Sequence, residues 1–263
     1  MSKSMLNKIL VALIMLAVVL PLCYMGGYFV LALALCVSAL AAYEINCLFN
    51  KEVNWVDVIL TFIFGASLIL LNKSYNTLVI LIWLFTLYVL YLFGKERHRD
   101  FVAYTFVISV MVNLAMHTIT MFYVKGTHYG FLVLIYIAIT SYGCDSAAYF
   151  AGSFFGKHKL LPKVSPNKTW EGAIGGYVVG AVVSFIWGLL MLKEYHISFI
   201  LTASLILPVV AQIGDLAFSS IKRRFEIKDF GEEFPGHGGI IDRTDSLIFA
   251  LLCFQCLLLL LWY

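Results

Sequence analysis

The chain carries little charge for its length. Asp, Glu, Lys and Arg make up 13% of its 263 residues, whereas a soluble globular domain carries about 25% charged residues. Hydrophobic residues account for 62%, and the mean hydropathy is +0.93. This composition excludes an ordinary soluble domain and predicts an all-α polytopic membrane protein.

Several other features are missing. No loop combines a long basic tract with stacking aromatic residues, so no nucleic-acid partner is expected. No fixed-period repeat and no Gly/Ser-rich or Pro-rich linker divides the chain, which predicts a single integral-membrane domain over residues 1–263. The first apolar run follows Lys3 and Lys8 but lacks a clear small-residue cleavage site. We therefore expect a retained first helix rather than a signal peptide.

The long apolar runs predict the membrane-spanning helices. A helix needs about 20 apolar residues to cross roughly 30 Å of hydrocarbon. Only Met25 and Gly26 separate the first two runs, so eight spans is the competing count. The nine predicted spans cover about 9–23, 26–47, 55–71, 77–93, 101–123, 130–152, 171–192, 197–218 and 245–262.

Basic residues between these runs predict the orientation. With nine spans and a cytoplasmic N-terminus, the cytoplasmic segments hold fifteen of the eighteen Lys and Arg residues, leaving Lys73, Lys125 and Lys193 outside. This asymmetry is the one that the positive-inside rule describes. Both large polar loops then face the cytoplasm. Compact size and the absence of an organelle-targeting segment indicate a bacterial inner membrane.

Residues 1–100 read as generic membrane helices, and the chemistry is expected in residues 140–250. In the first part, ionisable residues such as Glu44 are scattered, and we interpret Glu44 as a structural contact. Asp215 to Asp245, by contrast, hold seven of the fifteen acidic and five of the eighteen basic residues. Charge beside membrane helices is costly unless it finds partners or serves ion or phosphate chemistry. This charged segment is therefore the candidate functional region.

Three residues at the end of the eighth run share a helix face. Asp215, Ser219 and Lys222 are spaced i, i+4 and i+7, which places them on one face of a helix. The carboxylate and hydroxyl oxygens suit Mg²⁺, and the ammonium suits a phosphate. The spacing predicts a site that holds a metal ion and a phosphate together.

Two carboxylates mark the entry to the last run. Asp242 and Asp245 are spaced i, i+3 and would repel each other, so a bound cation is one reason to keep them there. Bridging by Arg243 or Arg223 is the alternative. They follow a turn containing Gly236, Gly238 and Gly239, and glycine lets backbone N–H groups approach a phosphate closely. His237, in the same turn, has three open roles: ligand, acid–base group or carbonyl-bonded turn residue.

A second polar segment precedes the seventh run. Asp145 lies near the end of the sixth run, and Ser165 to Gly172 open the seventh, with Thr169 placed to cap the new helix. A helix N-terminus beside several lysines, including Lys168, favours an anionic group. Contact with lipid headgroups is the alternative interpretation.

These motifs resemble one family. Ser219-x-x-Lys222-Arg223-x4-Lys228-Asp229, followed by Pro235-Gly236-His237-Gly238-Gly239-x-x-Asp242-Arg243-x-Asp245, resembles the signature of the phosphatidate cytidylyltransferases (CDP-diacylglycerol synthases). Asp145-x-x-Ala148-Tyr149 and Ser165-Pro166-x-Lys168-Thr169-Trp170-Glu171-Gly172 are similar as well. The resemblance covers about residues 140–250. Glu232 and Glu233 depart from it by being more acidic than the family's pattern.

The resemblance implies an activity and its participants. CTP and phosphatidic acid would give CDP-diacylglycerol and pyrophosphate, with Mg²⁺ as cofactor, K⁺ as a second candidate, and a homodimer at the lipid bilayer. It implies catalytic roles for Asp215, Ser219, Lys222, Asp242 and Asp245, with Asp215 and Asp242 as metal ligands. It implies substrate-binding roles for Asp145, Lys168, Arg223, Lys228, Asp229, Gly236, His237, Gly238, Gly239 and Arg243.

Two alternatives remain open from the sequence. A related enzyme could act on another lipid, as a CDP-archaeol synthase or a polyprenol or phytol kinase does. An ion-coupled transporter would also place Asp and Lys in membrane helices, but near the bilayer midplane rather than in a glycine-rich cytoplasmic loop.

Overall fold

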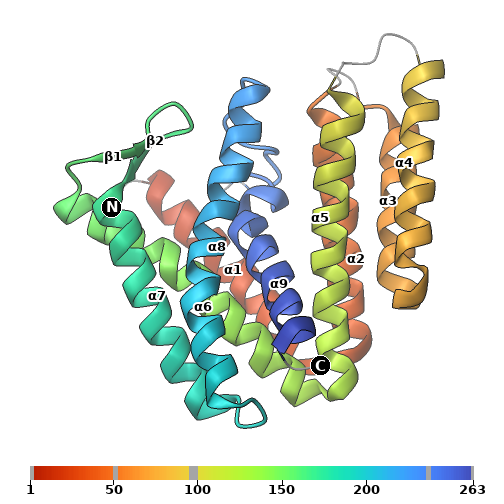
Figure 1. Cartoon of the computed structure of the whole chain (residues 1–263). Helices are drawn as coiled ribbons and strands as arrows, with labels where there is room; N and C mark the ends of the chain where they lie inside the picture. The colour runs from red at the N-terminus through yellow and green to blue at the C-terminus, as the bar shows by residue number, and fades with distance from the viewer. Residues whose placement is uncertain (1–2, 50–52, 95–99, 235–237, 262–263) are drawn as a thin grey trace. The chain divides into compact units, whose positions relative to one another are not determined.

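Helices dominate the computed structural model, which describes residues 3–49, 53–94, 100–234 and 238–261 (Figure 1). The helices are α1 (Lys3–Met25), α2 (Gly27–Cys47), α3 (Trp55–Leu70), α4 (Asn76–Phe93), α5 (Phe101–Phe122), α6 (Thr127–Phe155), α7 (Trp170–Met191), α8 (Ile197–Arg224) and α9 (Ile240–Leu261). Two 3₁₀ turns, Lys73–Tyr75 and Tyr123–Lys125, and two strands, β1 (Lys159–Leu161) and β2 (Ser165–Thr169), complete the described elements. The predicted all-α membrane fold is confirmed, with the antiparallel β1–β2 hairpin as one addition.

The helices of the described residues correspond to the nine predicted runs. Gly26 and Gly27 have φ of 67° and 51°, a left-handed conformation that favours glycine, and they separate α1 from α2. Within the described part of the chain, seven stretches are long and apolar enough to cross a membrane, while the first and third runs contribute shorter apolar segments, Leu13–Met25 and Trp55–Leu70. The cytoplasmic position of the N-terminus stays a prediction.

The chain divides into two compact units. The first unit comprises Met1–Thr127 and Asp229–Arg243, and the second comprises His128–Lys228 and Thr244–Tyr263. The single-domain organisation stays a prediction.

Aromatic packing holds the first unit together. Phe64 and Trp83 stack with ring centroids 4.9 Å apart and an interplanar angle of 8°. Leu87 and Phe101 join the same buried cluster. The indole Nε1 of Trp83 donates a hydrogen bond to Ser109 Oγ at 2.9 Å, so its polar atom is satisfied within the apolar surroundings.

Glycines let α7 approach α6 closely in the second unit. A Cβ at Gly176 would lie 2.7 Å from both Ala148 Cβ and the Cys144 carbonyl oxygen. One turn on, a Cβ at Gly180 would lie 3.0 Å from Cys144 Cβ. Small residues at such spacing are typical of helix contacts in membranes, because they allow backbones to pack together.

Replacing Gly176 by alanine is expected to destabilise the protein by about 1–3 kcal/mol, because the added methyl group meets a backbone oxygen. Gly143→Ala in α6 is the matched control, since its Cβ would meet nothing within 4 Å. The measurement is the midpoint of unfolding in detergent. Equal midpoints for the two variants would contradict the close packing.

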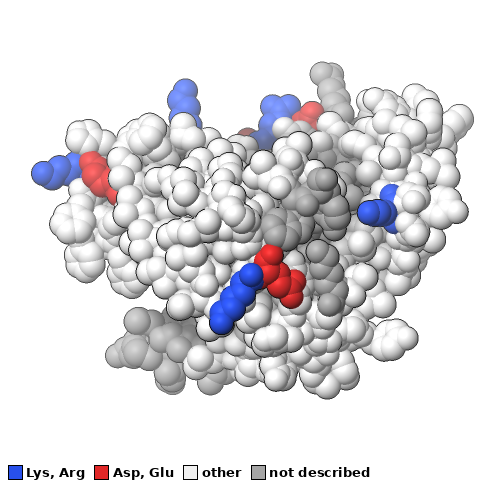
Figure 2. Space-filling view, turned by 60° about the horizontal axis from the view of Figure 1, so that its bottom comes forward, with Lys and Arg blue, Asp and Glu red and all other residues white. Residues whose placement is uncertain are grey.

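Large apolar side chains on the outside of the helices match the lipid-facing surface expected of a membrane protein. Phe85 in α4 is 68% exposed and Leu190 in α7 is 60% exposed. Figure 2 shows one face on which charged side chains are few and scattered among other residue types. Exposed apolar surface of this kind is stable in hydrocarbon but not in water.

Candidate active site

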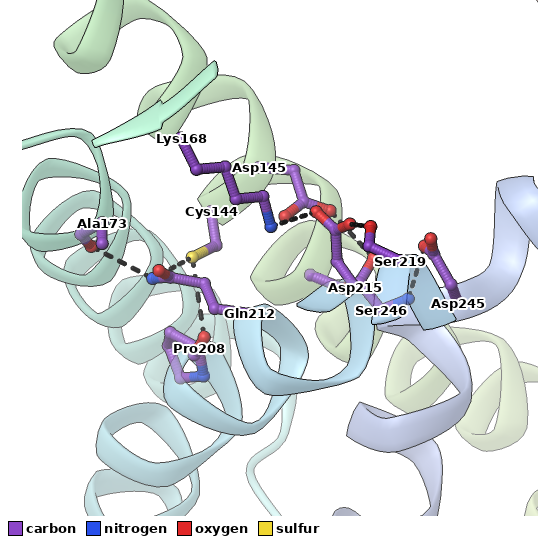
Figure 3. A network of polar contacts seen from close by, with 11 residues as sticks. Cys144, Asp145, Lys168, Ala173, Pro208, Gln212, Asp215, Ser219, Asp245 and Ser246 are labelled. Carbon is purple, nitrogen blue, oxygen red and sulfur yellow. Dashed lines mark hydrogen bonds and ion pairs between the residues drawn. The ribbon is translucent and has the colours of Figure 1, made fainter. Parts of the chain in front are cut away.

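Helix α8 brings together the three residues whose spacing predicted a shared face. Ser219 Oγ donates a hydrogen bond to Asp215 Oδ1 at 3.3 Å (Figure 3). Ser219 and Lys222 are buried, with exposed fractions of 8% each. The helix runs to Arg224, beyond the predicted limit of 218, because basic residues in the last turn suit the negative end of the helix dipole.

Lys168 and Asp145 reach the same region from other elements. The ammonium of Lys168, on β2, forms an ion pair with Asp215 Oδ2. Asp145, on α6, accepts a hydrogen bond from Ser246 Oγ on α9 at 2.8 Å. The backbone N–H of Ser246 donates to Asp245 Oδ1 at 2.7 Å. Figure 3 shows these side chains converging from β2, α6, α8 and α9.

Ser246 is a site residue that the sequence reasoning did not single out. Its hydroxyl lies between Asp145 Oδ2, at 2.8 Å, and Ser141 Oγ, at 3.0 Å. The residue is 1% exposed. The sequence offered one hint, that Ser246 directly follows the predicted site residue Asp245 in the same helix.

The charges in this polar cluster are coupled. The carboxylates of Asp145, Asp215 and Asp245 act on one another electrostatically, and Lys168 and Lys222 lie within range of the same groups. Three buried or half-buried carboxyl groups close together are costly to ionise at the same time. A bound cation is therefore favourable here.

A pocket opens beside the polar cluster. Its volume is about 440 Å³, within the range of sites for small molecules. The pocket is lined by Asp145, Ala148, Tyr149, Gly152, Ser153, Leu160, Asn167, Lys168, Thr169, Gly172, Ala173, Gln212 and Asp215. The lining therefore combines three charged side chains with hydroxyl, amide and apolar groups.

The hairpin that supplies Lys168 is tied to the helices around it. Thr169 Oγ1 accepts a hydrogen bond from the Gly172 N–H at 3.1 Å, which confirms the predicted cap of α7. Arg223 donates from Nε to the Val164 carbonyl at 3.2 Å and from Nη1 to the Ile227 carbonyl at 3.0 Å. Arg223 thus holds the hairpin turn to α8, and its substrate-binding role stays a prediction.

In the first unit, Asp242 organises the start of α9. Its Oδ2 accepts hydrogen bonds from the N–H groups of Phe230 at 2.7 Å and Gly239 at 3.0 Å. Gly238 has a φ of +77°, and a Cβ there would lie 2.8 Å from Asp242 Oδ2. The described glycines of the turn therefore allow close approach of the chain's own carboxylate.

The remaining predicted residues have different environments. Lys228 and Asp229 are exposed, and Arg243 is half-buried. Gly236 and His237 lie outside the described residues. Among the residues described, no group of three or more His, Cys, Asp or Glu side chains is placed to hold a metal ion. The assignment of Asp215 and Asp242 as metal ligands stays a prediction.

Fold and polar cluster together define a membrane-spanning helical protein with paired carboxylates and lysines beside a pocket. The sequence profile of the cytidylyltransferase family matches residues 6–261, so the chain belongs to this family.

Three similar proteins bear the name phosphatidate cytidylyltransferase. That of Bacillus subtilis is 42% identical over 123 residues, covering 47% of this chain and 46% of the relative. That of Haemophilus influenzae is 39% identical over 133 residues, covering 49% and 46%. That of Staphylococcus haemolyticus is 40% identical over 134 residues, covering 51% and 50%. The chain thus spans about half the length of these relatives.

Proposed function

We propose that the protein transfers CMP from CTP to phosphatidic acid, giving CDP-diacylglycerol and pyrophosphate. The observation that carries this proposal is the polar cluster of Asp145, Lys168, Asp215 and Ser219 at the edge of the pocket. Family membership and the names of the similar proteins support it.

The reaction is a substitution at the α-phosphorus of CTP. An oxygen of the lipid phosphate forms a bond to that phosphorus, and the bond to the β-phosphate oxygen breaks, so pyrophosphate leaves with the electron pair. Phosphatidate is already deprotonated near neutral pH, so no protein nucleophile is required. The task of the site is to neutralise and align two anions.

The described side chains suit that task. Lys168, now paired with Asp215, is placed to exchange this partner for a phosphate of the nucleotide. Lys222 lies near Asp245 and offsets charge on the other reactant. Ser219 and Ser246 hold the carboxylates of Asp215 and Asp145 through hydrogen bonds, which limits their movement when charge develops.

The donor set fits Mg²⁺. This ion usually keeps several waters and takes one or two carboxylates together with substrate phosphates, so a cage of three protein ligands is not needed. Asp215, whose side chain lines the pocket and is 25% exposed, is the predicted ligand in the second unit, and Asp242 is the predicted ligand in the first. When bound, Mg²⁺ supplies charge stabilisation to the phosphate oxygens and the leaving pyrophosphate. K⁺ is proposed as a second cation.

We further propose the bacterial inner membrane as the location, with the site facing the cytoplasm and the protein acting as a homodimer. A site at the membrane edge lets the diacyl tails remain in lipid while the headgroup meets a water-soluble nucleotide. The basic cytoplasmic loops would attract CTP.

The test is pyrophosphate release by purified protein in detergent with CTP, Mg²⁺ and phosphatidic acid, each omitted in turn. Release that requires all three, with CDP-diacylglycerol as the product, is expected. No release from folded protein would contradict the proposal. A panel with archaeal and prenol lipids then identifies a different acceptor, and flux across sealed vesicles without pyrophosphate identifies a transporter.

A further inference from the structure

Glu44 is a fully buried carboxylate near the end of α2, with an exposed fraction of 0%. Its Oε1 accepts a hydrogen bond from the Ile240 N–H at 2.5 Å, and its Oε2 accepts one from the Ile241 N–H at 2.9 Å. The contact joins residues almost 200 positions apart within the first unit. Glu44 therefore binds the beginning of α9 from a distant part of the chain.

The contact satisfies backbone groups that a helix leaves open. The first four N–H groups of an α-helix have no partner within the helix, and a negative charge there also interacts well with the helix dipole. Ile240 and Ile241 are the first two residues of α9. Glu44 thus acts as a bidentate cap supplied by another helix.

The same contact explains one glycine of the turn. A Cβ at Gly239 would lie 2.5 Å from the Glu44 Cδ atom and 2.6 Å from its Oε2. No residue with a side chain fits there unless the carboxylate moves. Gly239 is therefore required by the approach of Glu44, independently of any contact with a substrate.

Three consecutive backbone N–H groups donate to the carboxyl groups of Asp242 and Glu44. Gly239 donates to Asp242 Oδ2 at 3.0 Å, and Ile240 and Ile241 donate to Glu44. Because these groups are adjacent, fixing Ile240 and Ile241 also fixes the backbone of the turn that carries Asp242. The orientation of the Asp242 carboxylate follows from the position of that turn.

We propose that Glu44 is a positioning residue for the reaction: it locks the first turn of α9 so that Asp242 presents its carboxylate in one orientation. The proposal rests on the proposed function for the role of Asp242 in catalysis. A buried carboxyl group is a poor way to gain stability, since its desolvation is costly, but its two hydrogen bonds fix the backbone at the start of α9. Glu44 thus gives a role to one residue of the helices whose sequence looked generic.

The direct test is hydrogen exchange of the peptide covering residues 238–246, followed by mass spectrometry on the full-length protein in detergent. Glu44→Gln keeps the size of the side chain but turns an NH₂ group toward a backbone N–H. Exchange at Ile240 and Ile241 is expected to become about tenfold faster or more, because one of the two backbone N–H groups loses its acceptor. Asp57→Asn is the matched control, since Asp57 is also a buried carboxylate of the first unit, 3% exposed, and lies in α3.

A kinetic measurement tests whether the contact between Glu44 and the start of α9 matters for the reaction. Glu44→Gln is expected to lower kcat about tenfold or more while KM for CTP changes less than about threefold, because a misplaced catalytic group affects the transition state more than ground-state binding. Asp57→Asn is expected to keep both values. Normal exchange in the 238–246 peptide, or an unchanged kcat despite faster exchange, would overturn the proposal.

A second variant covers the case in which Glu44→Gln does not fold. Gly239→Ala pushes against the same carboxylate from the opposite side and should give the same local increase in exchange and the same loss of kcat. Faster exchange over the whole chain in both variants would show a general loss of stability and overturn the positioning role. If the wild-type protein makes no CDP-diacylglycerol, the proposed function fails, and the exchange result still decides whether Glu44 locks the turn.

Discussion

Asp215→Asn is expected to lower kcat about 10²- to 10³-fold, because a preorganised charge at the reacting phosphates is removed. The substitution is nearly isosteric, and the amide oxygen can still accept the Ser219 hydrogen bond that Asp215 Oδ1 accepts at 3.3 Å. The ion pair with Lys168 is lost, however, as is the predicted ligand for Mg²⁺. The measurement is the rate of pyrophosphate release at saturating CTP and phosphatidic acid.

The control for this variant is Glu194→Gln, which makes the same chemical change at an exposed residue between α7 and α8. It should leave kcat within about twofold, since exposed substitutions away from special contacts have small effects. Thermal unfolding of both variants reports whether the fold is intact. Near-normal turnover by folded Asp215→Asn protein would remove Asp215 from the active site.

The helices could be predicted from the sequence because hydrocarbon imposes long apolar runs. The polar ends of these helices could not be predicted in the same way. α8 continues six residues beyond the predicted limit of 218, and α9 begins at Ile240 rather than 245. The extension of α8 ends in basic residues that suit the helix dipole, and the start of α9 is capped by Glu44 and Asp242. Neither depends on apolar composition. The β1–β2 hairpin was missed for the same reason, since its five-residue strand is mostly polar.

Local spacing predicted part of the site. The contact between Asp215 and Ser219 follows directly from i, i+4 spacing on one helix. The ion pair between Lys168 and Asp215 joins residues on different elements, and only the resemblance to a family grouped them. Glu44 had no local signal, because its partners are backbone N–H groups, which every residue type carries. A lone buried carboxylate in a membrane helix was the one available hint.

Asp242→Asn separates two roles of Asp242, that of a hydrogen-bond acceptor at the start of α9 and that of a charged metal ligand. Asp242 Oδ2 accepts hydrogen bonds from Phe230 and Gly239, and an asparagine carbonyl can accept the same two bonds. The substitution should therefore keep the start of α9 intact while removing the negative charge. If Asp242 is a metal ligand, kcat falls about a hundredfold or more, and hydrogen exchange at Gly239 remains close to that of the wild-type protein.

Asp242→Ala provides the contrast, because it removes both the charge and the acceptor. It should abolish turnover and also accelerate exchange at Phe230 and Gly239 by about tenfold or more, since both N–H groups lose their buried partner. Asp57→Asn serves again as the control for a buried carboxylate of the same unit. If Asp242→Asn turns over at a near-normal rate while Asp242→Ala does not, Asp242 acts only by capping α9, and the cation must be held by other groups. Loss of turnover in both variants, with altered exchange in the alanine variant alone, identifies the charge itself as the catalytic requirement.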